Sequence, residues 1–158
     1  MSVKCFVAVV ATVMLVGSPM AMAQSIKTRF GPVSIERNVL MFRGRPVTPR
    51  VEGNNSLDID QVLQVGASDD VIVRDNGGTG CPVMFWVVSV TAQSAKASPE
   101  FGTCSEGADV SVKGNSVSLK MPTVATLAQM RAGLGDPGHM HVYIVTNGVV
   151  TDNGKPVH

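Results

Sequence analysis

The sequence predicts an all-β fold, an antiparallel sandwich or barrel-like roll with one short helix at most. Short apolar runs recur along the chain, and several alternate between apolar and polar residues as half-buried strands do. Glycine, asparagine and proline follow these runs at short intervals, which is typical of turns between strands. Because the segments needed as crossover helices are missing, a parallel βαβ enzyme fold is not expected.

The first 23 residues have the pattern of an export signal. Lys4 provides a positive charge, the stretch from Cys5 to Gly17 is uncharged and largely apolar, and Ala21-Met22-Ala23 matches a cleavage site. This stretch is too short to span a bilayer comfortably, and no other stretch reaches the length of a membrane helix. We therefore predict a signal peptide over residues 1–23 and a single β-rich domain over residues 24–158, periplasmic or secreted from a bacterium.

The charge of the mature chain excludes some partners. The 158 residues include 13 basic and 12 acidic side chains. Removal of residues 1–23 takes away Lys4 alone among them, which leaves 135 residues with 12 basic and 12 acidic side chains. A neutral surface has no net attraction for nucleic acid or an anionic membrane. We therefore expect no nucleic-acid partner. Because no other stretch has the length of a membrane helix, we also expect no integral membrane segment after signal cleavage.

The first predicted strands lie between residues 39 and 73. Val39–Phe42 is a short apolar run, and Leu57–Asp60 alternates as a half-buried strand does. Val62–Val65 continues this pattern after a one-residue change of phase, which predicts a β-bulge. Val71–Val73 is the next strand, and the glycine-rich segment Asp75–Gly80 closes it with a turn.

Val83–Val90 is the most apolar segment of the mature chain. It lacks a clean alternation, which indicates a central strand covered on both faces. Phe85 and Trp86 lie within this segment, so we expect them in the core rather than on a binding surface.

Two hairpins and one helix are predicted in the last third of the chain. Thr123–Arg131 has helical spacing with Thr123 as an N-cap, and Gly133–Gly138 follows as a loop. The first hairpin has Val110–Val112 and Val117–Met121 on either side of the turn Gly114-Asn115. The second has His141–Val145 and Val149–Thr151 on either side of the turn Asn147-Gly148. Residues 39–47 and 149–157 also resemble each other and share a glycine, a basic residue, proline and valine in order.

The mature chain keeps two cysteines, Cys81 and Cys104. In an oxidising compartment such a pair is typically joined by a disulfide. The C-x-x-C spacing that favours a redox centre is absent. We therefore predict a structural disulfide, which would contribute about 3 kcal/mol through loop-closure entropy.

His139-Met140-His141 is the clearest metal-binding pattern in the sequence. Two histidines at positions i and i+2 of a strand point to the same face, and imidazole suits copper or zinc. His139 and His141 are therefore candidate ligands, but a stable site needs three or four, and His158 is the one other histidine. No cofactor is expected on this basis.

The charged residues are unevenly distributed along the chain. One interpretation is that a basic and an acidic block balance through ordinary ion pairs. The other is a basic face that docks on an acidic partner, a glycan or a lipid phosphate. The aspartates lack the residue order of an EF-hand calcium loop. The candidate binding residues of the basic block are Arg37, Arg43, Arg45 and Arg50, beside Arg29; the aspartates are Asp58, Asp60, Asp69, Asp70 and Asp75.

Three segments carry a resemblance to a known group of proteins. They are Gly53–Leu57, Asp75–Pro82 and Ser98–Ser105, and the last two contain Gly-Gly-x-x-Cys-Pro and Phe-Gly-x-Cys-Ser. With these segments the chain resembles a group of small, exported proteobacterial proteins of unknown function. The resemblance implies export, a Cys81–Cys104 bond and one β-rich domain. It implies no activity and no functional residues.

The sequence thus predicts an exported, non-enzymatic β-rich binding domain whose partner is an envelope protein, and an inhibitor or immunity protein is one form of this class. The chain has no G-x-S-x-G motif and no P-loop. The alternative is a small envelope enzyme, or a copper or zinc carrier, whose site is assembled from distant residues.

Overall fold

The computed structural model describes residues 24–123 and 139–157, which form thirteen strands and contain no helix. Sheet A contains β1 (Ser25–Thr28), β2 (Gly31–Glu36), β3 (Val39–Phe42) and β4 (Arg45–Pro46). Sheet B contains β5 (Ser56–Val65), β6 (Ser68–Asn76), β7 (Val83–Val90) and β8 (Ala95–Ala97). Sheet C contains β9 (Asp109–Lys113), β10 (Ser116–Pro122), β11 (Met140–Thr146), β12 (Val149–Asp152) and β13 (Lys155–Pro156).

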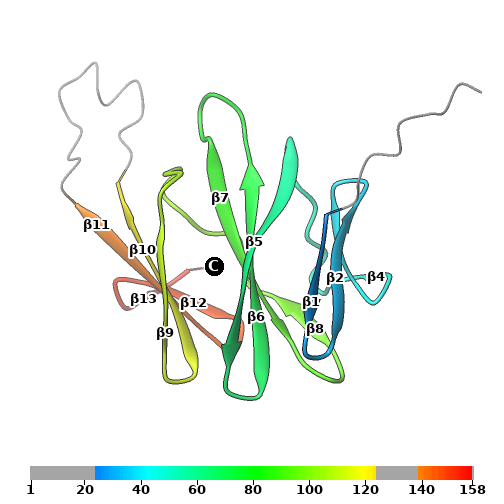
Figure 1. Cartoon of the computed structure of the whole chain (residues 1–158). Coiled ribbons are helices and arrows are strands. Elements are labelled where there is room, and N and C mark those ends of the chain that lie inside the picture. The colour runs from blue at the N-terminus through cyan, green and yellow to red at the C-terminus, as the bar shows by residue number, and fades with distance from the viewer. Residues whose placement is uncertain (1–23, 124–138, 158) are drawn as a thin grey trace, which may run out of the picture.

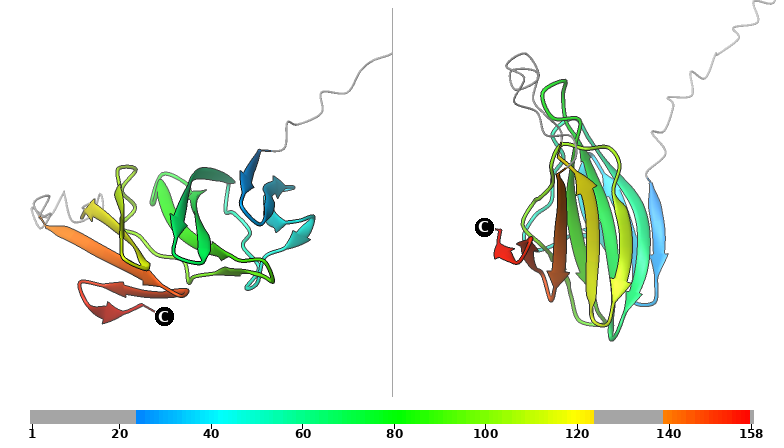
Figure 2. Two further views of the ribbon diagram at one scale, coloured as in Figure 1. Left: turned by 60° about the horizontal axis from the view of Figure 1, so that its bottom comes forward. Right: turned by 90° about the vertical axis from the view of Figure 1, so that its left-hand side faces the viewer.

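The three sheets are stacked as the layers of a sandwich. Each sheet is a meander in which every strand pairs antiparallel with its neighbours along the chain. In Figure 1 sheet C lies on the left, sheet B in the middle and sheet A on the right. The left view of Figure 2 shows the same order. The all-β sandwich predicted from the sequence is therefore confirmed, and none of the three described sheets closes into a barrel.

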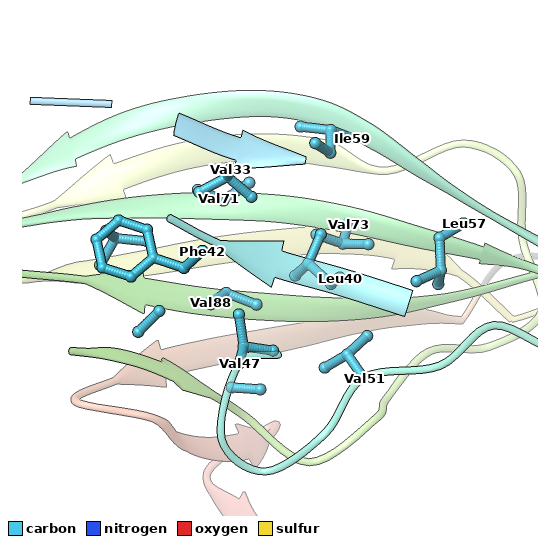
Figure 3. Close-up of a cluster of buried hydrophobic side chains, with 13 residues drawn as sticks. Val33, Leu40, Phe42, Val47, Val51, Leu57, Ile59, Val71, Val73 and Val88 are labelled. Carbon is cyan, nitrogen blue, oxygen red and sulfur yellow. The ribbon is translucent and has the colours of Figure 1, made fainter. Parts of the chain in front are cut away.

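Sheet B is covered on both faces. Adjacent valines of β7, both fully buried, belong to different cores: Val88 packs with side chains of sheet A, and Val87 with side chains of sheet C. In β6, Val71 likewise belongs to the core with sheet A, and Ile72 to the core with sheet C. Figure 3 shows the first core, where Leu40 of β3 and Val73 of β6 lie between the two sheets. The predicted central position of Val83–Val90 is confirmed.

Most of the predicted strands and turns are also observed. The pairing of β5 with β6 shifts between Ile59 and Gln61, which places the expected bulge at Asp60. The loop after Asn76 joins β6 to β7, as its glycines predict. Both hairpins of the last third are present, β9–β10 and β11–β12.

Tight two-residue turns connect several strands of sheets A and C. Asn147 and Gly148 have φ values of 51° and 79° and join β11 to β12. Two consecutive residues with positive φ give a turn whose twist matches that of the paired strands, and glycine and asparagine tolerate this region best. The same conformation, with positive φ at both residues, occurs at Arg37-Asn38, Arg43-Gly44 and Asn153-Gly154.

The resemblance between residues 39–47 and 149–157 extends to a shared meander. The unit β2–β3–β4 corresponds to β11–β12–β13, and equivalent residues are 110 positions apart, as Arg43 and Asn153 are. Val47 donates its backbone N–H to Leu40 at 3.2 Å, and Val157 donates to Val150 at 2.9 Å. The outer layers on the two faces of sheet B are therefore built from the same three-strand unit.

The sequence predicted about eight strands, and the structure has more. The two-residue strands β4 and β13 are too short for periodicity to reveal them, and β1, β2 and β8 were not recognised. The predicted signal peptide over 1–23 and the loop Gly133–Gly138 lie outside the described residues, as do His158 and all but Thr123 of the predicted helix Thr123–Arg131. Residues 24–123 and 139–157 contain no helix that could cross a membrane.

Candidate functional site

The predicted basic residues all belong to sheet A or its connections. Arg43 is held tightly: its Nε donates to the carbonyl of Phe30 at 2.8 Å, Nη2 donates to the same carbonyl, and Nη1 donates to the carbonyl of Ala92 at 3.2 Å. Its guanidinium carbon lies 4.9 Å from the ring centre of Phe42. Gly31 permits this arrangement, because a Cβ there would lie 2.9 Å from the Arg43 Nε.

Arg43 and Arg45 line a hollow of about 480 Å³ between the β4 edge and the turn before β8. We call it the arginine groove. Its other lining residues are Phe42, Pro46, Val47, Thr48, Gln93, Ser94 and Ala95, so no carboxylate is among them. Neither arginine takes part in an ion pair found in the described residues. The groove therefore combines two positive charges with an apolar wall.

Arg37 and Arg50 lie at a different hollow. Glu36 and Glu52 line it as well, and the Nε of Arg50 lies 2.9 Å from a carboxylate oxygen of Glu52. The charges of this hollow therefore cancel. The structure thus brings together two of the four predicted binding arginines, Arg43 and Arg45, as an uncompensated pair.

Part of the predicted aspartate block is buried rather than exposed. The Asp69 side chain is 2% exposed and accepts from the Nε of Arg29 at 2.6 Å. Asp75 is buried, and one of its oxygens accepts from the backbone N–H of Asn54 at 2.8 Å. Burial raises the pKa of the neighbouring Glu100, and the Asp75 carboxylate adds to the effect. Ion pairing between the basic and acidic blocks is thus realised at Arg29 and Asp69.

The two candidate metal ligands lie close together at the start of β11. The ring centres of His139 and His141 are 5.3 Å apart, and the Nδ1 of His141 lies 2.8 Å from an oxygen of Asp152. Tyr143 stacks on His141, and burial together with the Asp152 carboxylate raises the pKa of Tyr143 to about 12. No group of three or more histidine, cysteine or acidic side chains suited to a metal occurs in residues 24–123 and 139–157.

Cys81 and Cys104 are joined as predicted, with the two sulphur atoms 1.96 Å apart. The bond closes a loop that contains β7 and β8, so it ties together two strands of the central sheet and the segment that leads to sheet C. The bond that the sequence predicts between these two cysteines is therefore present.

A second hollow, of about 330 Å³, escaped the sequence analysis. Its floor is a row of register partners across sheet B, Asp70 of β6, Ser89 of β7 and Lys96 of β8. Because Ser89 follows Val88 in the strand, the row lies on the face toward sheet C. Its other polar lining residues are Ser68, Thr91, Ser94, Asn115 and Asn147. We call it the turn pocket, because it lies among the turns at one end of sheets B and C.

Only the strand register brings the turn-pocket residues together. Asp70 and Ser89 are 19 positions apart and become neighbours through the pairing of β6 with β7. The signal available in the sequence was local: Ser68, Asp70, Ser89 and Thr91 are polar residues at the ends of predicted strands. Such residues are common beside turns, so the pattern by itself did not indicate a pocket.

Comparison of the chain with protein-family models, curated proteins and solved structures finds no match. The resemblance to small exported proteobacterial proteins therefore stays a prediction.

Proposed function

We propose that the protein is an exported, non-enzymatic binding domain of the bacterial envelope that recognises an acidic surface of an envelope protein through the arginine groove. The observation that carries this proposal is the uncompensated pair Arg43 and Arg45, with no carboxylate among the lining residues of the groove. Inhibitors and immunity proteins belong to this class of small binding domain.

The groove suits a carboxylate for two reasons. The guanidinium of Arg43 is preorganised, because the carbonyls of Phe30 and Ala92 fix its position. Arg45 is exposed on the edge strand β4 and lines the same groove, so its side chain is accessible to a ligand there. Guanidinium groups bind carboxylates with directional, charge-assisted hydrogen bonds, and complementary charge speeds the encounter of two proteins.

The rest of the groove suits a protein rather than a free anion. Phe42, Pro46, Val47 and Ala95 provide apolar surface beside the two charges. An acidic side chain, or a chain terminus next to an apolar residue, would use both features. Interfaces typically combine such an apolar centre with arginine and a polar rim.

The test is capture of envelope proteins by the disulfide-bonded chain of residues 24–158. Wild type, Arg45→Glu and the control Lys27→Glu are immobilised and exposed to envelope extract of the host at low salt. Lys27 lies on β1, is exposed and does not line the groove. We expect a protein that wild type and Lys27→Glu retain and that Arg45→Glu retains at least about tenfold less, with retention falling as salt rises.

Equal retention by all three proteins, or no retained protein, would contradict the proposal. A captured partner that is a hydrolase or toxin, and that loses activity on binding, would identify the inhibitor form of the class.

A further inference from the structure

The turn pocket adjoins the arginine groove at Ser94 but has a different chemistry. The polar row Asp70, Ser89 and Lys96 continues the face of sheet B that carries the buried Ile72 and Val87. The apolar core between sheets B and C therefore ends in a row of polar groups. The hairpin turns of β5–β6 and β9–β10 point to this same end of the molecule (Figure 1).

One glycine, Gly66, lets two walls of the pocket approach closely. Gly66 has a φ of +54°, and a Cβ there would lie 2.9 Å from the Oδ1 of Asn115. Gly148 has a φ of +79°, and the side chain of Lys96 passes over it. Strand pairing fixes the backbone of both turns, so the pocket keeps its shape without a ligand.

Asp70 is the best acceptor in the pocket and is almost fully buried, with 3% of its surface exposed. Its Oδ1 accepts from the hydroxyl of Ser68 at 3.1 Å, and Ser89 is its register partner on β7. A carboxylate offers about four acceptor positions, so acceptor capacity is left for a ligand. Burial raises the pKa of Asp70, and the two hydroxyls act against this effect.

The other groups define the ligand class. The lining residues provide four hydroxyls and two carboxamides, which both donate and accept hydrogen bonds. The charged groups are one carboxyl and one ammonium, Asp70 and Lys96, so the pocket is neutral overall and selects neither a strong anion nor a strong cation. Its volume of about 330 Å³ is at the lower end of ligand pockets, roughly 300–1,000 Å³.

We propose that the turn pocket is a binding site for a single hexose-type sugar unit, with Asp70 and Lys96 as its principal hydrogen-bonding groups. A hexose presents hydroxyls around its whole edge, each a donor and an acceptor, which matches the mixed lining of the pocket. This site adjoins the proposed protein-binding groove, and Ser94 is the one lining residue that the two have in common.

The test is an NMR titration of the ¹⁵N-labelled, disulfide-bonded chain of residues 24–158. The probes are glucose, galactose, mannose and N-acetylglucosamine, each to about 50 mM, with glycine as a zwitterionic comparison. We expect saturable amide shifts for at least one sugar, with a Kd of about 1–10 mM, and the largest shifts near Gly66, Ser89 and Asn147. Glycine should produce no such shifts.

Two variants and two controls locate the site. Asp70→Asn and Lys96→Met should each weaken sugar binding by at least about tenfold. Lys96 is exposed, so its loss does not threaten the fold. The controls Asp60→Asn, at the exposed bulge of β5, and Arg45→Glu, in the arginine groove, should bind as wild type does.

No saturable shift with any of the four sugars would overturn the proposal. Shifts that map elsewhere, that persist unchanged in Lys96→Met, or that glycine reproduces at the same concentration would overturn it equally.

Discussion

Arg29 holds the carboxylate of Asp69 from two directions. Its side-chain Nε donates to Oδ1 at 2.6 Å, and its backbone N–H donates to Oδ2 at 2.6 Å. Arg29 directly follows β1, whereas Asp69 lies in β6, so this pair joins sheet A to the central sheet. The Asp69 carboxylate is almost fully buried, so its charged form depends on these two donors for stabilisation.

Arg29→Met should lower the free energy of unfolding by about 2 kcal/mol. The substitution keeps the backbone donor but removes a charge-assisted hydrogen bond to a buried carboxylate. Urea denaturation at neutral pH measures the loss. Lys27→Met, an exposed change on β1 two residues before Arg29, is the control and should alter stability by less than about 0.5 kcal/mol. Equal effects of the two changes would show that the Arg29–Asp69 pair contributes nothing specific.

Removal of the disulfide should destabilise the protein by about 3 kcal/mol. The Cys81–Cys104 bond closes a loop that contains two strands of sheet B, so its loss enlarges the unfolded ensemble. The double variant Cys81→Ser and Cys104→Ser can be compared with wild type by thermal unfolding. Mass spectrometry of the wild type should find the two cysteines linked, and two free thiols in the purified protein would refute the pairing.

Val87→Ala and Val88→Ala should each cost about 2 kcal/mol of stability, because both valines are fully buried although they are adjacent in one strand. In a sheet with one solvent-exposed face, one of the two changes would be nearly neutral. Val149→Ala is the matched control, since that valine is 60% exposed. A large difference between the first two variants would contradict the three-layer arrangement.

Asp70→Asn should make the protein more stable at pH 7 and less sensitive to pH. The pKa of Asp70 is raised above its ordinary value of 3.8 mainly by burial, and the nearby Asp69 carboxylate contributes. The folded state therefore binds the proton more tightly than the unfolded state. The stability due to protonated Asp70 is complete below about pH 3.8 and is lost as the pH rises through the folded-state pKa.

Urea denaturation of wild type and Asp70→Asn at pH 3.5, 5 and 7 measures this effect. The stability of wild type relative to the variant should fall between the lowest and the highest pH. A constant difference across the three pH values would mean that Asp70 does not titrate as described. Glu100→Gln can be measured in the same series. Because the pKa of Glu100 is also raised, the stability of wild type relative to this variant should likewise fall as the pH rises.

Much of the fold followed from local patterns. The missing alternation of Val83–Val90 indicated burial on both faces, and the two cores confirm it. The phase change before Val62 predicted the bulge of β5, and Asn147-Gly148 predicted the β11–β12 hairpin. These features depend on neighbours within a few residues, so periodicity and turn chemistry are sufficient to find them.

The layering and the pockets depend on contacts that local patterns do not encode. The local pattern near Val39 does not predict that β2–β4 cover one face of sheet B and β11–β13 the opposite face. In the same way, the sequence does not show which arginines are compensated. Glu36 and Glu52 line the hollow of Arg37 and Arg50, whereas no carboxylate lines the groove of Arg43 and Arg45. Such neighbours are fixed by tertiary packing rather than by spacing along the chain.

The order of the sheets along the chain has a kinetic consequence. The described strands within residues 25–46, within residues 56–97, and within residues 109–122 and 140–156 form one sheet each. Every ladder among these strands joins two that follow one another in sequence. Pairing therefore requires the closure of hairpin-sized or slightly longer loops, and no strand has to search for a partner across the whole chain. The sandwich should thus assemble faster than a Greek-key protein of similar length, with docking of preformed meanders onto sheet B as its slow step.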